Sequence, residues 1–138
     1  MGKLPFLVLC SVLLLIAFFM LACGSSSQLQ SISISPATAD AKDYANGQVQ
    51  FTATGTYADG SQVKPLTALW TPAPPWSLTP QQPWPAITLD STGLASCGRA
   101  NPGTYMIVAT APVDPHSPLL QMTMSTPQAG GTATLTCP

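Results

Sequence analysis

The sequence predicts an all-β protein in which short antiparallel strands form a sandwich. Two observations carry this prediction. Apolar and polar residues alternate with a period of two in several short segments, and turns rich in Gly, Asp and Pro separate these segments. Beyond the N-terminal segment, no stretch has helical apolar spacing over several turns. About seven or eight short strands at regular spacing favour two packed antiparallel sheets.

The longest alternating segment lies in the first half of the predicted domain. A short strand is expected at 31–35 (SISIS), where two isoleucines share one face. Residues 48–57 (QVQFTATGTY) alternate throughout, which predicts a half-buried antiparallel strand. Gly55 interrupts its apolar face and indicates a bulge or the close approach of another backbone. The Asp-Gly pair that ends at Gly60 supplies the positive φ of a tight hairpin turn.

Strand signals continue after this turn, with one long interruption. The strand at 66–71 places Trp70 on its apolar face. Residues 71–85 (TPAPPWSLTPQQPWP) then contain six prolines, which predict an irregular or polyproline-like loop. Residues 104–111 are apolar on both faces, as expected of a central strand. Further strands are expected at 86–89, 94–97 and 132–137, the last with Cys137 facing inward, and one more can be placed at 119–124.

An uncharged apolar run precedes the predicted domain. After Lys3, residues 4–22 are mainly Leu, Val, Ile, Phe and Met, which is typical of a long signal-peptide core or of a short membrane span. The run ends at MLACG (20–24), which resembles the lipobox of bacterial lipoproteins, an apolar pair, a small residue and the cysteine that receives diacylglycerol. Leu21 is bulkier than the residue usual at its position. An ordinary cleaved signal peptide and an uncleaved N-terminal anchor are the alternatives.

The lipoprotein interpretation predicts the domain organisation. Residues 1–22 are then the signal peptide, and Cys23 carries the lipid, since several acyl chains on one residue give firm anchoring. Residues 23–29 begin with glycine and serines and lack basic residues, so they suit a flexible tether. Residues 30–138 form one exported domain.

The exported part is polar but weakly charged. It carries three basic and five acidic residues and no glutamate, so its slightly negative balance argues against a nucleic-acid partner. Thr, Ser, Gln, Pro and Gly supply its solubility instead, a composition that is poor in helix formers.

The four cysteines have different expected fates. Cys10 leaves with the signal peptide, and Cys23 takes the lipid. An even pair in an exported chain then predicts a disulfide between Cys97 and Cys137. The alternative is a pair of metal ligands, but two cysteines and one distant histidine are too few for a structural zinc site.

Six pieces of the chain occur in a familiar order: SISISPATA, GQVQFTATGTYADGS, LTALWT, ITLDSTGLAS, PGTYMIVAT and TATLTC. Their order and wording resemble the bacterial immunoglobulin-like domain, group 2 (BIG2), of intimin- and invasin-like adhesins and many surface lipoproteins. The resemblance spans residues 31–137 and implies an immunoglobulin-like β-sandwich with Trp70 in its middle. The pairing of Cys97 with Cys137 resembles a variant in some lipoprotein members, not the bridge of antibody domains. The proline-rich insert and the long segment 113–128 depart from the family pattern.

The insert carries the best candidate binding residues, Trp76 and Trp84. Exposed tryptophans can stack on sugar rings or dock a partner protein, because aromatic side chains dominate binding hot spots. Folded back, they would instead cap one end of the sandwich. The sequence leaves both arrangements open.

Catalytic and metal-binding signals are weak. His116 lies two residues from Asp114, but no nucleophile motif accompanies them, so a solvated loop histidine is expected. Asp40 and Asp43 are close in sequence, yet their segment is not a calcium loop. We therefore expect no catalytic residue, no metal and no cofactor.

The sequence thus predicts a non-catalytic cell-envelope lipoprotein that acts as a surface interaction, adhesion or structural module. It is expected to be exported and lipid-anchored to the bacterial cell envelope, at the outer membrane, on its periplasmic or surface face. Its expected partners are the membrane, through the lipid on Cys23, and a protein or glycan that the sequence does not identify. The alternative is a carbohydrate-binding lipoprotein that uses Trp76 and Trp84.

Overall fold

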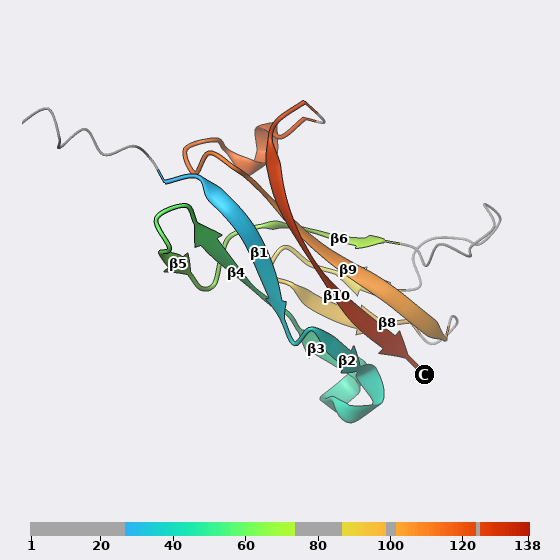
Figure 1. Ribbon diagram of the computed structural model, residues 1–138. Helices are drawn as coiled ribbons and strands as arrows, with labels where there is room; N and C mark the ends of the chain where they lie inside the picture. Colours follow the sequence, from blue (N-terminus) through green and yellow to red (C-terminus); the bar gives the residue numbers. More distant parts are fainter. Residues whose placement is uncertain (1–26, 74–86, 99–101, 124) are drawn as a thin grey trace, which may run out of the picture.

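The protein is an all-β sandwich, which confirms the predicted fold class (Figure 1). The computed structural model describes residues 27–73, 87–98, 102–123 and 125–138. Cys23, Trp76 and Trp84 lie outside these residues. The strands form two layers that pack around one apolar core.

The first layer is built around one strand that is interrupted once. β3 (Gln48–Gln50) and β4 (Thr52–Tyr57) are separated by Phe51, whose N–H donates to the carbonyl oxygen of Gly93 at 2.9 Å. Because this hydrogen bond continues the ladder, the two three-stranded sheets that contain β3 and β4 form one layer. The remaining strands of the layer are all antiparallel to their neighbours: β1 (Leu29–Ser35), β5 (Gln62–Val63), β7 (Ile87–Leu89) and β8 (Leu94–Cys97).

The second layer is centred on a long antiparallel ribbon. β9 (Gly103–Pro112) pairs with β10 (Gln128–Cys137) along the whole length of both strands. β6 (Leu69–Ala73) pairs antiparallel with the other edge of β9, and β2 (Thr38–Asp40) lies parallel to β10. β9 is therefore a central strand, as its apolar composition predicts.

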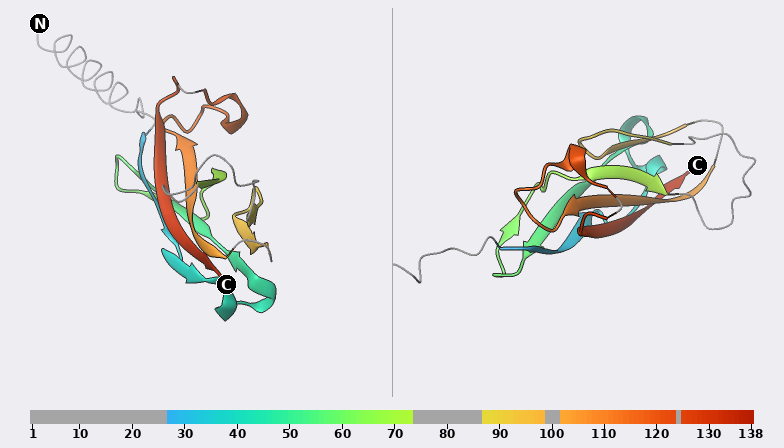
Figure 2. Two further views of the ribbon diagram at one scale, coloured as in Figure 1. Left: turned by 90° about the vertical axis from the view of Figure 1, so that its right-hand side faces the viewer. Right: turned by 90° about the horizontal axis from the view of Figure 1, so that it is seen from above.

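The chain changes layers between β1 and β2. β1 pairs with β4 in the first layer, whereas β2 follows after two residues and pairs with β10 in the second. The resulting strand neighbours are those of an immunoglobulin-like sandwich whose first strand is split between the layers. The start of β1 and the C-terminal Pro138 lie at opposite ends of the sandwich in both views of Figure 2.

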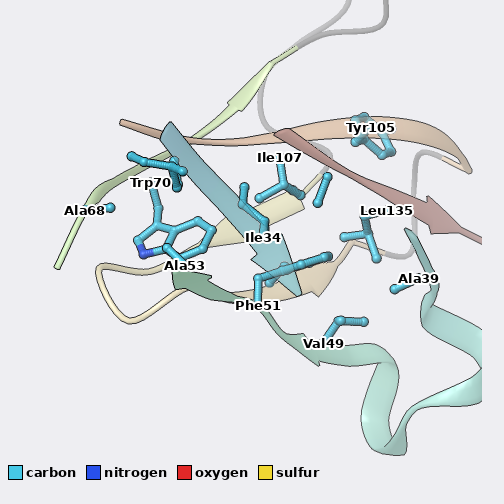
Figure 3. Close-up of a cluster of buried hydrophobic side chains, with 14 of the residues drawn as sticks. Ile34, Ala39, Val49, Phe51, Ala53, Ala68, Trp70, Tyr105, Ile107 and Leu135 are labelled. Carbon is cyan, nitrogen blue, oxygen red and sulfur yellow. The ribbon is translucent and has the colours of Figure 1, made fainter. Parts of the chain in front are cut away.

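Because side chains alternate between the two faces of each strand, the apolar residues predicted from the sequence lie in the core. Val49 and Phe51 are buried on the first layer, and Ile107 and Leu135 are buried on the ribbon of the second (Figure 3). Trp70 is only 9% exposed and lies among these core residues, as the resemblance implies. At about 25 cal/mol per Å² of apolar area removed from water, these large side chains are the main source of stability.

The predicted bulge or backbone approach at Gly55 is wrong. Gly55 pairs in register with Ile32 on one side and with Val63 on the other. A Cβ at this position would lie 2.9 Å from Leu29 Cδ1 and 3.1 Å from both Cδ atoms of Leu66. The glycine therefore makes room for two leucine side chains from neighbouring segments.

The strand placed at 119–124 is also wrong. A short 3₁₀ helix, η3 (Leu119–Gln121), takes its place, and no strand follows in residues 122–123. Both edges of β9 are already occupied by β6 and β10, so the alternating apolar residues have no free edge there to pair with. Leu120 is instead 99% exposed.

Several element boundaries differ from the expected ones. β1 begins at Leu29, the last residue of the predicted tether, and β6 is shifted toward the insert by comparison with 66–71. Pro72 fits within β6 because this strand lies at the edge of its layer. The short strands β2 and β5 were not expected. Two 3₁₀ helices that join β2 to β3 were not expected either, η1 (Ala41–Asp43) and η2 (Ala45–Gly47).

Candidate functional site

The predicted disulfide between Cys97 and Cys137 is present, with the two Cα atoms 5.6 Å apart. Cys97 ends β8 in the first layer, and Cys137 ends β10 in the second, where its side chain is 3% exposed. The bond therefore joins the two layers at one end of the sandwich. We refer to this end as the disulfide end.

The proline-rich insert is attached at the disulfide end. β6 ends at Ala73, which pairs with Met106 near the start of β9, and β7 begins at Ile87, which pairs with Cys97. The candidate binding residues Trp76 and Trp84 come between β6 and β7 in the sequence and are outside the described residues. The structure therefore positions both attachment points of the insert, on elements fixed by strand pairing and a disulfide.

The chain enters the sandwich at the other end. Ala58 N donates to Gln28 O at 2.9 Å, and Asp59 N donates to Ser27 Oγ at 3.1 Å. These bonds hold the residues before β1 against the turn that follows β4. We refer to this end as the entry end. The predicted lipidation residue, Cys23, lies outside the described residues.

No helix in the described part of the chain is long and apolar enough to cross a membrane.

A groove of about 430 Å³ lies beside Trp70, between the turn that joins β7 to β8 and the segment that leads into β6. Its floor is apolar and includes Phe51, Leu66 and Trp70, and hydroxyl and amide side chains surround it. Gln50 already uses its amide here, since Nε2 donates to Phe51 O at 2.9 Å and to Thr92 O at 2.7 Å. None of the described residues that line the groove is charged, so the groove suits at most a small neutral ligand.

The turn at the edge of this groove is organised by Asp90. Its Oδ1 accepts hydrogen bonds from Thr92 Oγ1 at 2.7 Å, Thr92 N at 2.8 Å and Leu94 N at 3.0 Å. These bonds, first the one from the Thr92 hydroxyl, lower the pKa of Asp90 below its ordinary value. The carboxylate therefore has a structural task in this turn.

His116 and Asp114 are brought together only through the backbone. The N–H of His116 donates to Asp114 Oδ1 at 2.9 Å, and both residues are exposed. This contact forms a local turn. It does not orient the imidazole toward a nucleophile.

Asp40 forms an ion pair with Lys42. Lys42 Nζ lies 2.7 Å from Asp40 Oδ2, and this hydrogen bond lowers the pKa of Asp40 and raises that of Lys42. In the part of the chain that the structure describes, no three His, Cys, Asp or Glu side chains gather closely enough to hold a metal ion.

Two features of the site were not predicted from the sequence. The first is the pair of hydrogen bonds that Ser27 and Gln28 accept from the turn after β4. The sequence offers no signal for them, because both residues belong to the predicted tether. The second is the exposure of Leu120. The prolines at 115 and 118 are a signal against a strand there, because proline cannot donate to a ladder.

Comparison with known proteins finds no family model that matches this chain. No curated protein matches it significantly either.

Proposed function

We propose that this chain is a non-catalytic lipoprotein of the bacterial cell envelope, whose immunoglobulin-like domain acts as a surface interaction, adhesion or structural module. Its lipid is carried by Cys23, and its partner is a protein or a glycan. The proposal combines the lipobox-like residues 20–24, the resemblance to BIG2 domains and the sandwich fold.

One observation supports this function best: the chain enters the sandwich at one end, and the insert is attached at the other. The chain enters at Leu29, whose N–H donates to Val113 O at 2.9 Å, next to the end of β9. The insert with Trp76 and Trp84 is attached at the disulfide end, next to the start of β9. A lipid attached shortly before Leu29 therefore leaves both attachment points of the insert on the side of the domain away from the membrane.

The disulfide end is suited to hold a binding loop in place. Residues at both attachment points of the insert are in β-ladders, and Ile87 is 2% exposed. Loops on a rigid scaffold bind with less ordering cost than free loops do.

The experiment that tests the anchor is the intact mass of the protein purified from bacterial membranes, before and after reduction. The proposal predicts residues 23–138 plus acyl chains, with a gain of two hydrogen masses on reduction for the bond between Cys97 and Cys137. A mass for the full, unacylated chain would reject the lipoprotein function.

The second candidate is a carbohydrate-binding lipoprotein that uses Trp76 and Trp84. The attachment of the insert at the end remote from the tether favours it, because a sugar on a cell surface or matrix would approach from that side. Indole rings stack on the apolar faces of sugars, and no charged residue lies between positions 74 and 86.

A glycan array separates the two candidates. A double Trp76→Ala/Trp84→Ala variant would lose sugar binding while it keeps its thermal unfolding temperature. Tyr44→Ala is the matched control, because Tyr44 is an aromatic residue that is 39% exposed and lies outside the insert. Binding that survives the double variant, or no binding by the parent protein, would leave the protein-interaction function as the better proposal.

A further inference from the structure

We infer that the entry end carries a second membrane contact, an apolar surface that rests on the lipid bilayer. This entry-end surface consists of Val63, Pro115, Leu119 and Leu120. The inference depends on the proposed lipid anchor at Cys23 and goes beyond it, because it fixes which side of the domain faces the membrane.

The distance between the anchor and the domain is short. Ser27 is already fixed, since its Oγ accepts from Asp59 N at 3.1 Å. The four residue steps from Cys23 to Ser27 span at most about 14 Å at roughly 3.6 Å a residue. The polar headgroup zone is about 5–8 Å deep on each side of a bilayer. A lipid on Cys23 therefore keeps the entry end at the membrane surface.

Two large apolar side chains at this end, Val63 and Leu120, are exposed, whereas Leu119 is partly buried against the core. Leu120 is 99% exposed, and Val63 is 44% exposed. Val63 lines a groove of about 260 Å³ together with Leu29, Tyr57, Leu66, Pro115 and Leu119, and Leu120 directly follows Leu119 in the chain. An exposed leucine next to an apolar groove is unfavourable in water and favourable at a lipid interface.

The rest of the molecule offers no equivalent grouping among its described residues. Two other large apolar side chains are exposed, Tyr44 and Leu69. Neither lines the entry-end groove nor directly adjoins in the chain a residue that does. Single exposed apolar residues are normal on soluble domains. The entry-end surface, where several apolar residues lie together, is therefore the surface that we expect to bind a partner.

The mixture of acidic and basic residues at this end favours a contact with lipid that is apolar and not electrostatic. Asp59 and Lys64 lie in one segment at this end, and Asp114 and His116 in another, so the described residues here form no basic cluster that would attract anionic lipids. We expect the contact to be insensitive to salt and to the content of anionic lipid.

Photo-crosslinking tests this inference on the full chain in bacterial membranes. A diazirine amino acid replaces exposed Gln121, which leaves Leu120 intact. The matched control replaces exposed Gln48, which starts β3 at the disulfide end. Because position 121 lies at the entry end and position 48 at the disulfide end, lipid adducts should be several-fold more abundant at 121 than at 48.

A second variant tests the role of Leu120 itself. Leu120→Ser in the chain with the probe at 121 should reduce the lipid adducts several-fold without lowering the unfolding temperature, because Leu120 packs against almost nothing.

Three outcomes would overturn the inference. Equal adducts at 121 and 48, or an adduct at 121 with another polypeptide, in protein that carries acyl chains on Cys23, would reject the membrane contact and leave the anchor standing. The absence of acyl chains on Cys23 would reject both.

Discussion

At the scale of single residues, Gly93 holds the turn before β8 close to the core. Its φ is +86°, and a Cβ would lie 2.6 Å from Phe51 O and 2.9 Å from the indole of Trp70. Gly93→Ala therefore adds a backbone cost of about 1–2 kcal/mol to an overpacking cost of about 1–3 kcal/mol. We expect urea unfolding to show a loss of stability of that combined size.

Gly60→Ala is the control for this prediction. Gly60 has a similar φ of +80°, but a Cβ there would meet nothing within 4 Å. Its substitution should cost only the backbone contribution, about 1–2 kcal/mol. Equal losses for the two variants would mean that the contacts with Phe51 and Trp70 carry no energetic weight.

Asp90 makes stability depend on pH at the acid end. Its pKa is lowered in the folded protein, chiefly by the hydrogen bond from Thr92, so its contribution is complete above about pH 4 and is lost as the pH falls through the folded pKa. Asp90→Asn should therefore lower the unfolding temperature at neutral pH. The difference from the parent should shrink as the pH falls through the lowered pKa of Asp90 and the parent carboxyl is protonated.

Thermal melts of the parent and the variant across this pH range check the prediction. A difference that stays constant with pH would show that the charge on Asp90 does not contribute and that only the acceptor geometry matters.

At the scale of elements, Gly131 allows β10 to pass close to β1. A Cβ on Gly131 would lie 2.5 Å from Ile32 O, a backbone atom that cannot move aside cheaply. Gly131→Ala should therefore separate the strands and cost about 1–3 kcal/mol in chemical denaturation.

The neighbouring glycine supplies the control. A Cβ on Gly130 would meet its nearest atoms at 3.8 Å, which is ordinary contact. Gly130→Ala should leave stability unchanged or raise it slightly, because alanine loses less conformational entropy on folding. A larger loss at 130 than at 131 would contradict the close approach of β1 and β10.

The disulfide joins β8 to β10 across a sequence separation of 40 residues. For a loop of this size, the chain-entropy model gives about 4 kcal/mol of stabilisation. The double variant Cys97→Ala/Cys137→Ala should lose an amount of this order, measured by chemical denaturation, and the reduced parent should match it. A reduced parent that unfolds at the same denaturant concentration as the oxidised one would contradict this.

Elements with a strong local pattern were predictable. The alternation in 48–57 predicted both a strand and its buried face, and the apolar run around Ile107 predicted a central strand. β2 and β5 are too short to show a period, and they exist because β10 and β4 offer free edges. The segment 119–124 has the right alternation, but β6 and β10 already occupy both edges of β9, which the sequence does not reveal.

At the scale of the whole molecule, the site was only partly predictable. Cys97 and Cys137 could be paired from their number and the expected export, and the pairing is present. The assignments of Cys23, Trp76 and Trp84 remain predictions from sequence, since these residues lie outside the described part. The separation of an entry end from a disulfide end depends on strand order, so no local pattern contains it.

The lengthwise arrangement of the strands has a mechanical consequence. A pulling force applied between Leu29 and the attachment point of the insert at Ala73 acts roughly along β1 and β4, which are antiparallel. The hydrogen bonds of an antiparallel pair are perpendicular to its strands, so such a force shears them together and does not unzip them one after another. A tether and a binding partner at opposite ends of this sandwich would therefore load the domain in its stiffest direction.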